Sequence, residues 1–389
     1  MKNLLRYLNI ISILIIATNA IIFVSHAEII TIQPRIFIIF TAVVALLEFN
    51  FFKRKLTFNY LTKFYLFILV LFFAGLILTT FPEDALNLIR TQIYSIILII
   101  SLSILLQNKY VYDRIPKIIF YCSIFAVFFN IYEFFTPTSF MKVVGKSSGL
   151  YINPNSSAIA LLCFGLIGID YVKNQKLKML YLVFVALGIF LTLSRAGIAI
   201  SLIVFLFYFI KNKKQLFIIT LTIIVTALLA PILIDKMANT FSSNDVGLNR
   251  YSLVTDLFES KTSIVENIED DSRGYVAKQA FEMILDSPIF GYGLGAYRNI
   301  PYNQNVLETH NIYLAFGVDF GILGLFIYPI FIYYLFIHKR KDFNGVLLFI
   351  VFFVWGFASH NVLHEYFLIL VYTYYNVRKK QNENLLSNQ

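Results

Sequence analysis

Cysteine and charged side chains are both scarce in this chain of 389 residues. Its two cysteines, Cys122 and Cys163, lie within apolar stretches. Two cysteines are too few for a disulfide framework or a thiolate metal site, so we interpret them as small packing residues. Charged residues make up 14% of the chain and hydrophobic residues 59%, whereas about a quarter of a typical soluble domain is charged. Water is therefore not the main solvent of this protein.

Long apolar runs take the place of the missing charges. Runs of roughly 18 or more apolar residues recur, and each is long enough to cross a bilayer core of about 30 Å as a helix. We predict an all-α protein, a polytopic transmembrane helical bundle that forms a single integral membrane domain over residues 1–389. The pattern indicates about twelve spans, near 7–25, 35–52, 61–80, 88–106, 115–136, 156–172, 179–194, 197–210, 215–234, 312–337, 343–359 and 363–377.

The excess of basic residues is explained by their placement. The formal net charge is +10, and 20 of the 32 Lys and Arg residues gather at alternate ends of the predicted spans. These 20 are Lys2, Arg6, Lys53, Arg54, Lys55, Lys109, Arg114, Lys117, Lys173, Lys176, Lys178, Lys211, Lys213, Lys214, Lys339, Arg340, Lys341, Arg378, Lys379 and Lys380. The positive-inside rule places these segments and both termini in the cytoplasm. The charge thus encodes topology, and we expect no nucleic-acid partner.

The first apolar stretch has two interpretations. With Lys2 and Arg6 before it and Ser25-His26-Ala27 after it, it could be a signal peptide. We favour an uncleaved first span, because the stretch is longer than the 7–15 residues usual in a signal.

Two segments remain for the opposite, external face. Residues 137–155 form one predicted loop, and residues 235–310 form a longer one with eleven acidic and six basic residues. A loop of that length is usually functional or has secondary structure of its own. Within it, "SRGYVAKQAFEMILDSP" has helical spacing and a stop at Ser287-Pro288. We expect short amphipathic helices in the 235–310 loop, which carries part of the active site.

Three polar residues near this face are candidates for function. Arg195, in "LTLSRAGIAI", turns the chain between two apolar runs. An arginine at the membrane boundary is costly unless it faces a wet cavity or an anion; the alternative is a snorkelling anchor. Arg273 opens the predicted loop helix, and by itself it could be a solvated charge. His310 precedes the span 312–337 and could accept a proton from a hydroxyl group, or it could be a helix-end residue that meets lipid headgroups.

Three other patterns are interpreted as structural. Gly317, Gly321 and Gly324 would give one smooth helix face for close packing. The segment "GYGLGAY", residues 291–297, is a weak match to a dinucleotide-binding loop, because no strand precedes it. The segment "ENIEDDS", residues 266–272, could hold a divalent ion, but a solvated acidic turn is the better interpretation. We find no cluster of His, Cys and carboxylates with metal-ligand spacing, and expect neither a metal nor a cofactor.

Cations beside a possible base suit an anionic substrate. Arginines clamp phosphate oxygens and stabilise the charge that develops on a leaving group, while a histidine deprotonates an acceptor hydroxyl. The residues by themselves indicate an external site for an anionic, lipid-linked substrate.

Four segments together resemble the O-antigen ligase/polymerase superfamily of bacterial membrane glycosyltransferases. They are "GLYINPNSSA" (149–158), "LTLSRAG" (191–197), "SRGYVAKQAFEMILDSPIFGYGLGAY" (272–297) and "THNIYLAFGVDFGILGL" (309–325). The resemblance implies a metal-independent, inverting glycosyltransferase in the bacterial cytoplasmic (inner) membrane, with its active site on the periplasmic or external face. The donor would be a glycan linked to undecaprenyl diphosphate.

The resemblance also assigns roles to residues. It implies that Arg195 and Arg273 bind the diphosphate and that His310 is the base. Asn153 and Asn155 match the "nPN" element, whose role it does not specify. Further substrate-binding candidates are Arg90, Arg298 and Asn311. Asp319 departs from the family pattern, in which Glu is often found at this position. The aspartate side chain is shorter, which puts in doubt whether its carboxylate extends as far as the glutamate of the family.

The acceptor separates several interpretations. We favour an O-antigen or capsular polysaccharide polymerase, whose acceptor is another lipid-linked repeat unit and which can work with a chain-length regulator. A ligase would instead use lipid A core. Protein O-oligosaccharyltransferases tend to be longer, with an added periplasmic domain. A flippase or other transporter is the outsider, because it should place its charges in the middle of the membrane.

Overall fold

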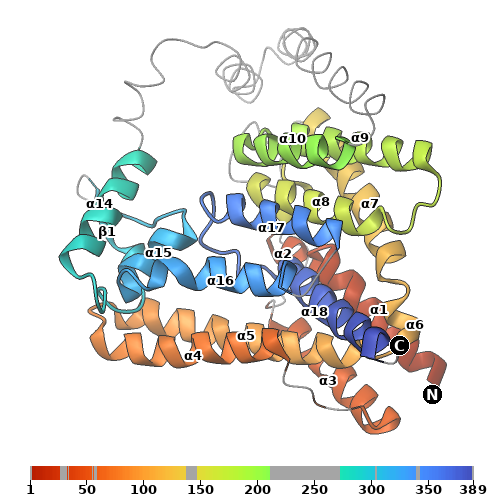
Figure 1. Cartoon of the computed structure of the whole chain (residues 1–389), viewed down its shortest axis with the longest axis horizontal. Coiled ribbons are helices and arrows are strands. Elements are labelled where there is room, and N and C mark those ends of the chain that lie inside the picture. Colours follow the sequence, from red (N-terminus) through yellow and green to blue (C-terminus); the bar gives the residue numbers. More distant parts are fainter. Residues whose placement is uncertain are drawn as a thin grey trace, which may run out of the picture. The chain divides into compact units, whose positions relative to one another are not determined.

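The computed structural model describes residues 2–26, 33, 35–54, 56, 59–136, 147–210, 272–302, 305–338 and 342–387. Residues 137–146 and 211–271 lie outside this part, and with them the predicted span 215–234 and the segment "ENIEDDS" apart from its final serine. The described chain is mostly α-helical (Figure 1), as predicted. It forms two compact units, which we call the first unit (residues 1–17, 33–114 and 265–389) and the second unit (18–32 and 115–264).

The first unit contains most of the helices and the polar loops between them. Its elements are α1 (Lys2–Ala17), α3 (Arg35–Phe52), α4 (Tyr60–Leu78), α5 (Pro82–Leu105), α6 (Lys109–Tyr112), α14 (Ser272–Asp286), η2 (Ala296–Arg298), β1 (Ile300–Tyr302), β2 (Asn305–Leu307), α15 (Ile312–Phe320), α16 (Gly324–Phe336), α17 (Phe343–Trp355) and α18 (Tyr366–Ser387). Helix α5 packs against α3, α4 and α18, and α15 packs against α14 and α16. Strands β1 and β2 pair antiparallel.

The second unit is a smaller helical group. Its elements are α2 (Ala20–His26), α7 (Ile115–Phe135), η1 (Gly149–Tyr151), α8 (Pro154–Gly168), α9 (Gln175–Leu191) and α10 (Arg195–Phe209). Helix α7 packs against α8 and α9, and α10 packs against the same two helices. Helix α8 is buried along nearly its whole length, so it is the centre of this unit.

Several described helices are suited to a bilayer. Four segments are long and apolar enough to cross it: Arg35–Phe52, Tyr60–Leu78, Pro82–Leu105 and Lys109–Phe134. Helices α8, α10, α16 and α17 are apolar but shorter. These features agree with a membrane protein, while the predicted count of about twelve spans stays a prediction.

The predicted span 312–337 is broken in the structure. Helix α15 ends at Phe320 and α16 begins at Gly324. Gly321 between them has a φ of +74°, which glycine adopts without steric cost, and a Cβ there would collide with the backbone of Pro288. The expectation that Gly317, Gly321 and Gly324 line one continuous helix face was therefore wrong. Similarly, the predicted span 7–25 is divided into α1 and α2 at Thr18-Asn19.

The helix predicted within "SRGYVAKQAFEMILDSP" is confirmed as α14, while the external position of its loop stays a prediction. Helix α14 begins at Ser272 and ends at Asp286, directly before Ser287-Pro288. Val276, Ala280 and Ile284 are four residues apart and buried, so they form one apolar face, and α14 packs against α15. A Cβ on Gly317 of α15 would meet the Ile284 side chain, which shows how closely the two helices approach. Arg273 consequently lies at the start of a helix that α15 supports.

Candidate active site

A glycine-rich loop, residues 291–295, lies between α15 and the turn that joins α4 to α5. Gly291, Gly293 and Gly295 have φ values of +68°, +86° and +91°, a region that glycine alone adopts readily. A Cβ on Gly293 would lie 2.6 Å from the backbone nitrogen of Thr79. The glycines of "GYGLGAY" therefore serve a close backbone approach within the fold.

Asp319 of α15 fastens this loop. Its carboxylate is buried and accepts hydrogen bonds from the backbone nitrogens of Gly295 at 3.1 Å and Tyr297 at 3.2 Å. Thr79 adds a hydrogen bond from its hydroxyl to the carbonyl of Leu294, at 2.7 Å. The short arm of Asp319 thus reaches inward, to the loop that leads to Arg298.

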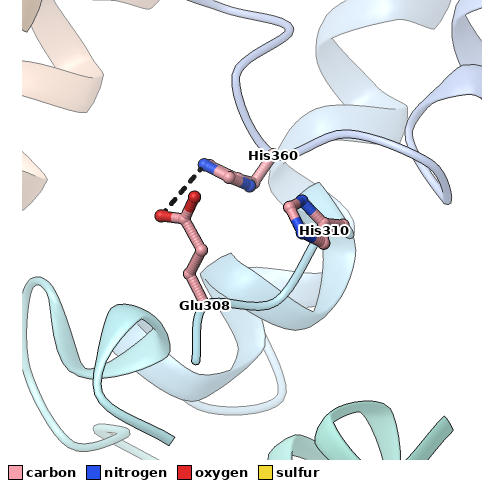
Figure 2. A group of neighbouring side chains, drawn as sticks. All are labelled: Glu308, His310 and His360. Carbon is pink, nitrogen blue, oxygen red and sulfur yellow. Dashed lines mark ion pairs between the residues drawn. The ribbon is translucent and has the colours of Figure 1, made fainter. Parts of the chain in front are cut away.

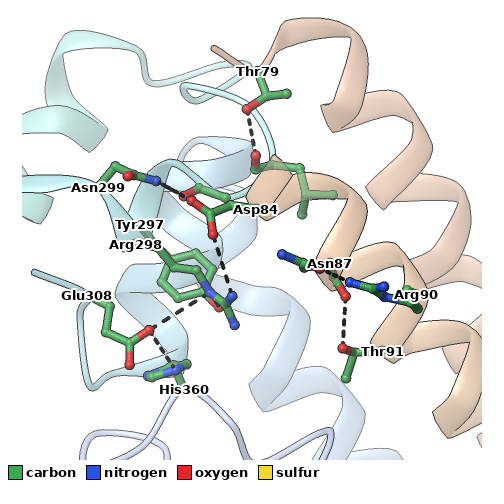
Figure 3. A network of polar contacts seen from close by, with 12 residues as sticks. Thr79, Asp84, Asn87, Arg90, Thr91, Tyr297, Arg298, Asn299, Glu308 and His360 are labelled. Atoms are coloured by element: carbon green, nitrogen blue, oxygen red, sulfur yellow. Dashed lines mark hydrogen bonds and ion pairs between the residues drawn. The ribbon is translucent and has the colours of Figure 1, made fainter. Parts of the chain in front are cut away.

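Arg298 lies between two carboxylates (Figure 3). Its Nε donates to the Tyr297 hydroxyl at 3.0 Å and lies 3.9 Å from Glu308 Oε2, while Nη1 lies 3.9 Å from Asp84 Oδ1. Asn299 donates to the other oxygen of Asp84 at 2.9 Å. This predicted substrate-binding cation is therefore held in a fixed direction. Arg90, on the exposed side of α5, bonds instead to Asn87 (Figure 3).

Glu308, His310 and His360 come together (Figure 2), and Arg298 lies beside Glu308 (Figure 3). Nε2 of His360 lies 3.5 Å from Oε2 of Glu308, and the two histidine rings are 5.8 Å apart between centroids. Backbone hydrogen bonds hold their segments in place, from Thr309 to Tyr297 at 3.1 Å and from Ile312 to Gly356 at 2.9 Å. His360 is 4% exposed, whereas His310 is exposed. His310 is therefore open to solvent, whereas His360 is enclosed by the protein.

The protein environment lowers the pKa of both histidines. Partial desolvation by the surrounding protein, followed by the positive charge of Arg273, lowers the pKa of His310 below 6.5, and Glu308 opposes the shift. Burial lowers the pKa of His360 to about 4; His310 and Arg298 add to this effect, and Glu308 again opposes it. A neutral imidazole at pH 7 can accept a proton. Because Arg273 acts on His310 through its charge, two of the predicted catalytic residues lie near each other.

Asn311 has a structural role next to His310. Its side-chain oxygen accepts hydrogen bonds from the backbone nitrogens of Tyr313 at 2.9 Å and Leu314 at 3.2 Å. This is an N-cap, which satisfies backbone donors in the first turn of a helix. Asn311 therefore starts α15, and His310 is left just outside the helix.

The other predicted residues are in the second unit, where two helix starts are tied together. Asn153 caps α8 by accepting from the backbone nitrogen of Asn155 at 2.8 Å, and Ser194 caps α10 by accepting from that of Gly197 at 3.2 Å. The Ser194 hydroxyl also donates to Oδ1 of Asn155 at 2.7 Å. Arg195, the first residue of α10, is exposed. The "nPN" element thus holds the turn that presents Arg195.

Buried polar side chains of α7 hold the segment before α8 and contact α8 and α9, and the sequence analysis did not single them out. Glu133 is fully buried and accepts from the backbone nitrogens of Ser148 at 2.8 Å and Gly149 at 2.5 Å. Asn130 donates to the Ser157 hydroxyl at 3.0 Å and to the carbonyl of Gly188 at 3.2 Å. An Asn and a Glu within the apolar run 115–136 are the signal that could have revealed this group.

The sequence analysis also overlooked His360. It lies in "ASHNVLHEY", residues 358–366, between two predicted spans. A histidine at such a break is a signal of the same kind as His310. Its partners are about fifty residues earlier in the chain, so the sequence offered no reason to connect them.

Helices suited to a bilayer, with arginines and a neutral histidine at loop-to-helix junctions, define a helical membrane protein with a polar site. A family model described as O-antigen ligase matches residues 180–328. The matched segment contains Arg195, Arg273, Arg298 and His310, and the predicted resemblance to the O-antigen ligase/polymerase superfamily is confirmed over it. No protein with a curated description matches the chain.

Proposed function

We propose that this protein transfers a glycan from an undecaprenyl-diphosphate-linked donor to a glycan acceptor, at the outer face of a bacterial cytoplasmic membrane. The observation that carries the proposal is that Arg273, at the start of α14, lies near enough to His310 for its charge to act on the imidazole ring. Both residues lie within the segment that matches the O-antigen ligase family. A base and a cation side by side are what displacement of a diphosphate by a hydroxyl group requires.

The proposed reaction is a single displacement without a metal ion. A ring nitrogen of His310 takes the proton of the acceptor hydroxyl as its oxygen attacks the anomeric carbon. The new C–O bond forms as the bond to the diphosphate breaks, and that electron pair leaves on the lipid diphosphate. Attack from the face opposite the leaving group inverts the anomeric configuration. General-base catalysis of this kind typically contributes 10²–10⁴-fold.

Arg195 and Arg273 are assigned to the donor diphosphate. A guanidinium group binds phosphate oxygens in a bidentate manner, and its charge stabilises the leaving group as the bond breaks. Both arginines are the exposed first or second residue of a helix. The positive end of each helix dipole also favours an anion there.

The remaining predicted residues fall into two groups. Arg90 and Arg298 are cations that we assign to substrate binding, and Arg298 is the better placed, because it lies beside Glu308 and His360. Asn153, Asn155 and Asn311 hold helix starts and turns. We therefore assign these three to positioning Arg195 and His310.

For the acceptor we propose a second lipid-linked repeat unit, so that the protein is an O-antigen or capsular polysaccharide polymerase. Transfer to lipid A core, as a ligase, is the alternative, and the description of the matched family supports it. A transporter is less well supported, because the candidate residues lie at helix starts and loops.

The test is glycan transfer by the purified protein in detergent with a chelator present. We expect wild type to convert lipid-linked donor to product, and Arg195→Ala, Arg273→Ala and His310→Ala to lose at least about 100-fold in rate. Lys278→Ala is the matched control, since Lys278 is exposed on the same helix as Arg273. Normal activity in all three variants, or no transfer by wild type to either acceptor, contradicts the proposal.

A deletion strain distinguishes the two acceptors. One repeat unit on lipid A core identifies a polymerase, whereas bare core with accumulated lipid-linked polymer identifies a ligase.

A further inference from the structure

The side chains of Glu308, His310 and His360 offer three metal-ligand atoms in one place (Figure 2). One such atom from each residue lies within 4.8 Å of the other two. Nε2 of His360 and Oε2 of Glu308 are 3.5 Å apart, close to the roughly 3.4 Å between neighbouring ligands of a tetrahedral zinc ion with bonds of about 2.0–2.2 Å. The 4.8 Å limit exceeds this separation, so His310 has to turn closer to the other two ligands, and its side chain is exposed.

His360 gives a second and independent indication of a ligand. It is 4% exposed, and neither ring nitrogen makes a hydrogen bond of normal geometry, although the ring also interacts with the backbone of Thr309. Buried polar nitrogens are nearly always satisfied in folded proteins, and an exception calls for an explanation such as an unseen ion. The Nε2 atom points to the carboxylate of Glu308 (Figure 2). A cation between these two groups would satisfy both.

Two histidines and one carboxylate select a particular class of metal. Imidazole suits zinc, copper, nickel and iron, whereas magnesium and calcium prefer oxygen ligands throughout. Three protein ligands also leave one coordination position open. Two neighbouring arginines should weaken the binding of a divalent cation by charge repulsion. Arg298 lies 3.9 Å from Glu308, and the charge of Arg273 acts on His310. We therefore expect reversible binding that these two positive charges weaken.

We propose that Glu308, His310 and His360 bind a divalent transition cation of the zinc class, which occupies the His310 nitrogen and inhibits glycan transfer. The metal uses the lone pair that would otherwise accept the proton of the acceptor hydroxyl. Its charge also draws Glu308 away from Arg298. The binding site stands on geometry alone, while the inhibition rests on the proposed role of His310.

The experiment uses the full chain in detergent, with Co²⁺ as a spectroscopic probe and Zn²⁺ as the competitor. We expect one Co²⁺ per chain, with visible absorption bands that Zn²⁺ abolishes. His360→Gln and Glu308→Gln should each weaken binding at least tenfold. His338→Gln, a histidine in the turn after α16, is the control and should bind as wild type does. In the transfer assay, Zn²⁺ should inhibit wild type, a chelator should restore activity, and His360→Gln should need at least tenfold more Zn²⁺.

Each outcome has a separate meaning. No saturable binding by wild type, or wild-type binding in both variants, overturns the site. Binding that His360→Gln weakens, without inhibition of transfer, overturns the inhibitory role and counts against His310 as the base. If wild type binds Co²⁺ but shows no glycan transfer when a chelator is present, the result counts against the proposed function and leaves the metal site standing. If His360→Gln does not elute as a single species, Glu308→Gln decides, because that side chain is partly exposed.

Discussion

At the scale of single residues, the central observation is that a charge on one helix contributes to the proton affinity of a histidine beside another helix. Desolvation is the larger cause of the lowered pKa of His310, which precedes α15, and the charge of Arg273 on α14 adds to it. The same guanidinium is assigned to the donor diphosphate. An anion bound there would neutralise its charge and make His310 a stronger base when the donor is present.

The first prediction concerns the titration of His310. Because its pKa is lowered below 6.5, the neutral ring should persist to more acidic pH than in a model peptide. Arg273→Gln removes one cause of the shift and should move the titration to higher pH. The measurement is the rate at which diethyl pyrocarbonate modifies His310 between about pH 5 and 8, followed by mass spectrometry with a chelator present. Lys278→Gln is the control, and an identical titration in Arg273→Gln contradicts the effect.

Asp319 provides the second prediction. It is buried, and its two carboxylate oxygens accept hydrogen bonds from the backbone nitrogens of Gly295 and Tyr297. In Asp319→Asn the side-chain NH₂ group would replace one of these oxygens and face a backbone N–H, so that one hydrogen bond is lost. We expect Asp319→Asn to lower the free energy of unfolding by about 1–3 kcal/mol and to reduce transfer, because the loop leading to Arg298 loosens. Thermal unfolding in detergent and the transfer assay measure the two effects. Asp286→Asn, at an exposed position, should change neither, and equal stability of both variants would argue against the fastening role.

At the scale of elements, caps determine where the candidate residues lie. Arg195 and His310 each adjoin a cap, Ser194 and Asn311 respectively. The cap fixes the first turn of the helix, and the candidate side chain projects from that point. The link from Ser194 to Asn155 adds a connection between two helix starts.

The third prediction tests this link. Asn155→Ala removes the acceptor of the Ser194 hydroxyl, a loss of about 1 kcal/mol, and we expect transfer to fall by about five- to tenfold. Ser194→Ala should lose the cap as well, and the double variant should be no worse than the more severe single one, because the residues are coupled.

Asn174→Ala is the matched control for the third prediction. Asn174 caps α9 by accepting from the backbone nitrogen of Lys176 at 2.8 Å, so its loss also weakens a helix start. It makes no contact with Ser194 among the hydrogen bonds of the described residues. Equal losses of activity in Asn155→Ala and Asn174→Ala would mean that the link has no special role.

At the scale of the whole molecule, the open prediction is topology. The basic clusters predict that the termini lie inside and the loop of residues 235–310 outside. The native thiols allow a direct test, because Cys122 and Cys163 are buried, at 3% and 0% exposure. Wild type should therefore react little with a membrane-impermeant maleimide.

The fourth prediction follows from this topology. Lys278→Cys should be labelled in cells whose cytoplasmic membrane is intact, whereas Lys176→Cys should be labelled only after that membrane is opened. Both lysines are exposed on the protein, so the barrier should be the membrane itself. The reverse pattern would overturn the assigned orientation and, with it, the external site.

The sequence by itself determined the features that depend on local pattern. Apolar length indicated membrane helices, and period and a following Ser-Pro gave the bounds of α14. Arg195 and His310 were candidates because each is a polar group at the boundary of an apolar run, whereas Arg273 became a candidate through the family resemblance. The preference of side chains for water or lipid and the helix propensity of the backbone act over a few turns. The local amino-acid sequence is therefore enough to predict their effects.

Only the tertiary structure decided how distant residues combine. It brought His360 to Glu308 and His310 across about fifty residues, turned Asp319 inward to the loop before Arg298, and broke the span 312–337 at Gly321. The break illustrates the reason. Periodicity favours an unbroken helix there, but the backbone of Pro288 leaves no room for a Cβ and the chain turns through a left-handed glycine. Such outcomes depend on which surfaces meet in space, and close packing rather than local preference determines them.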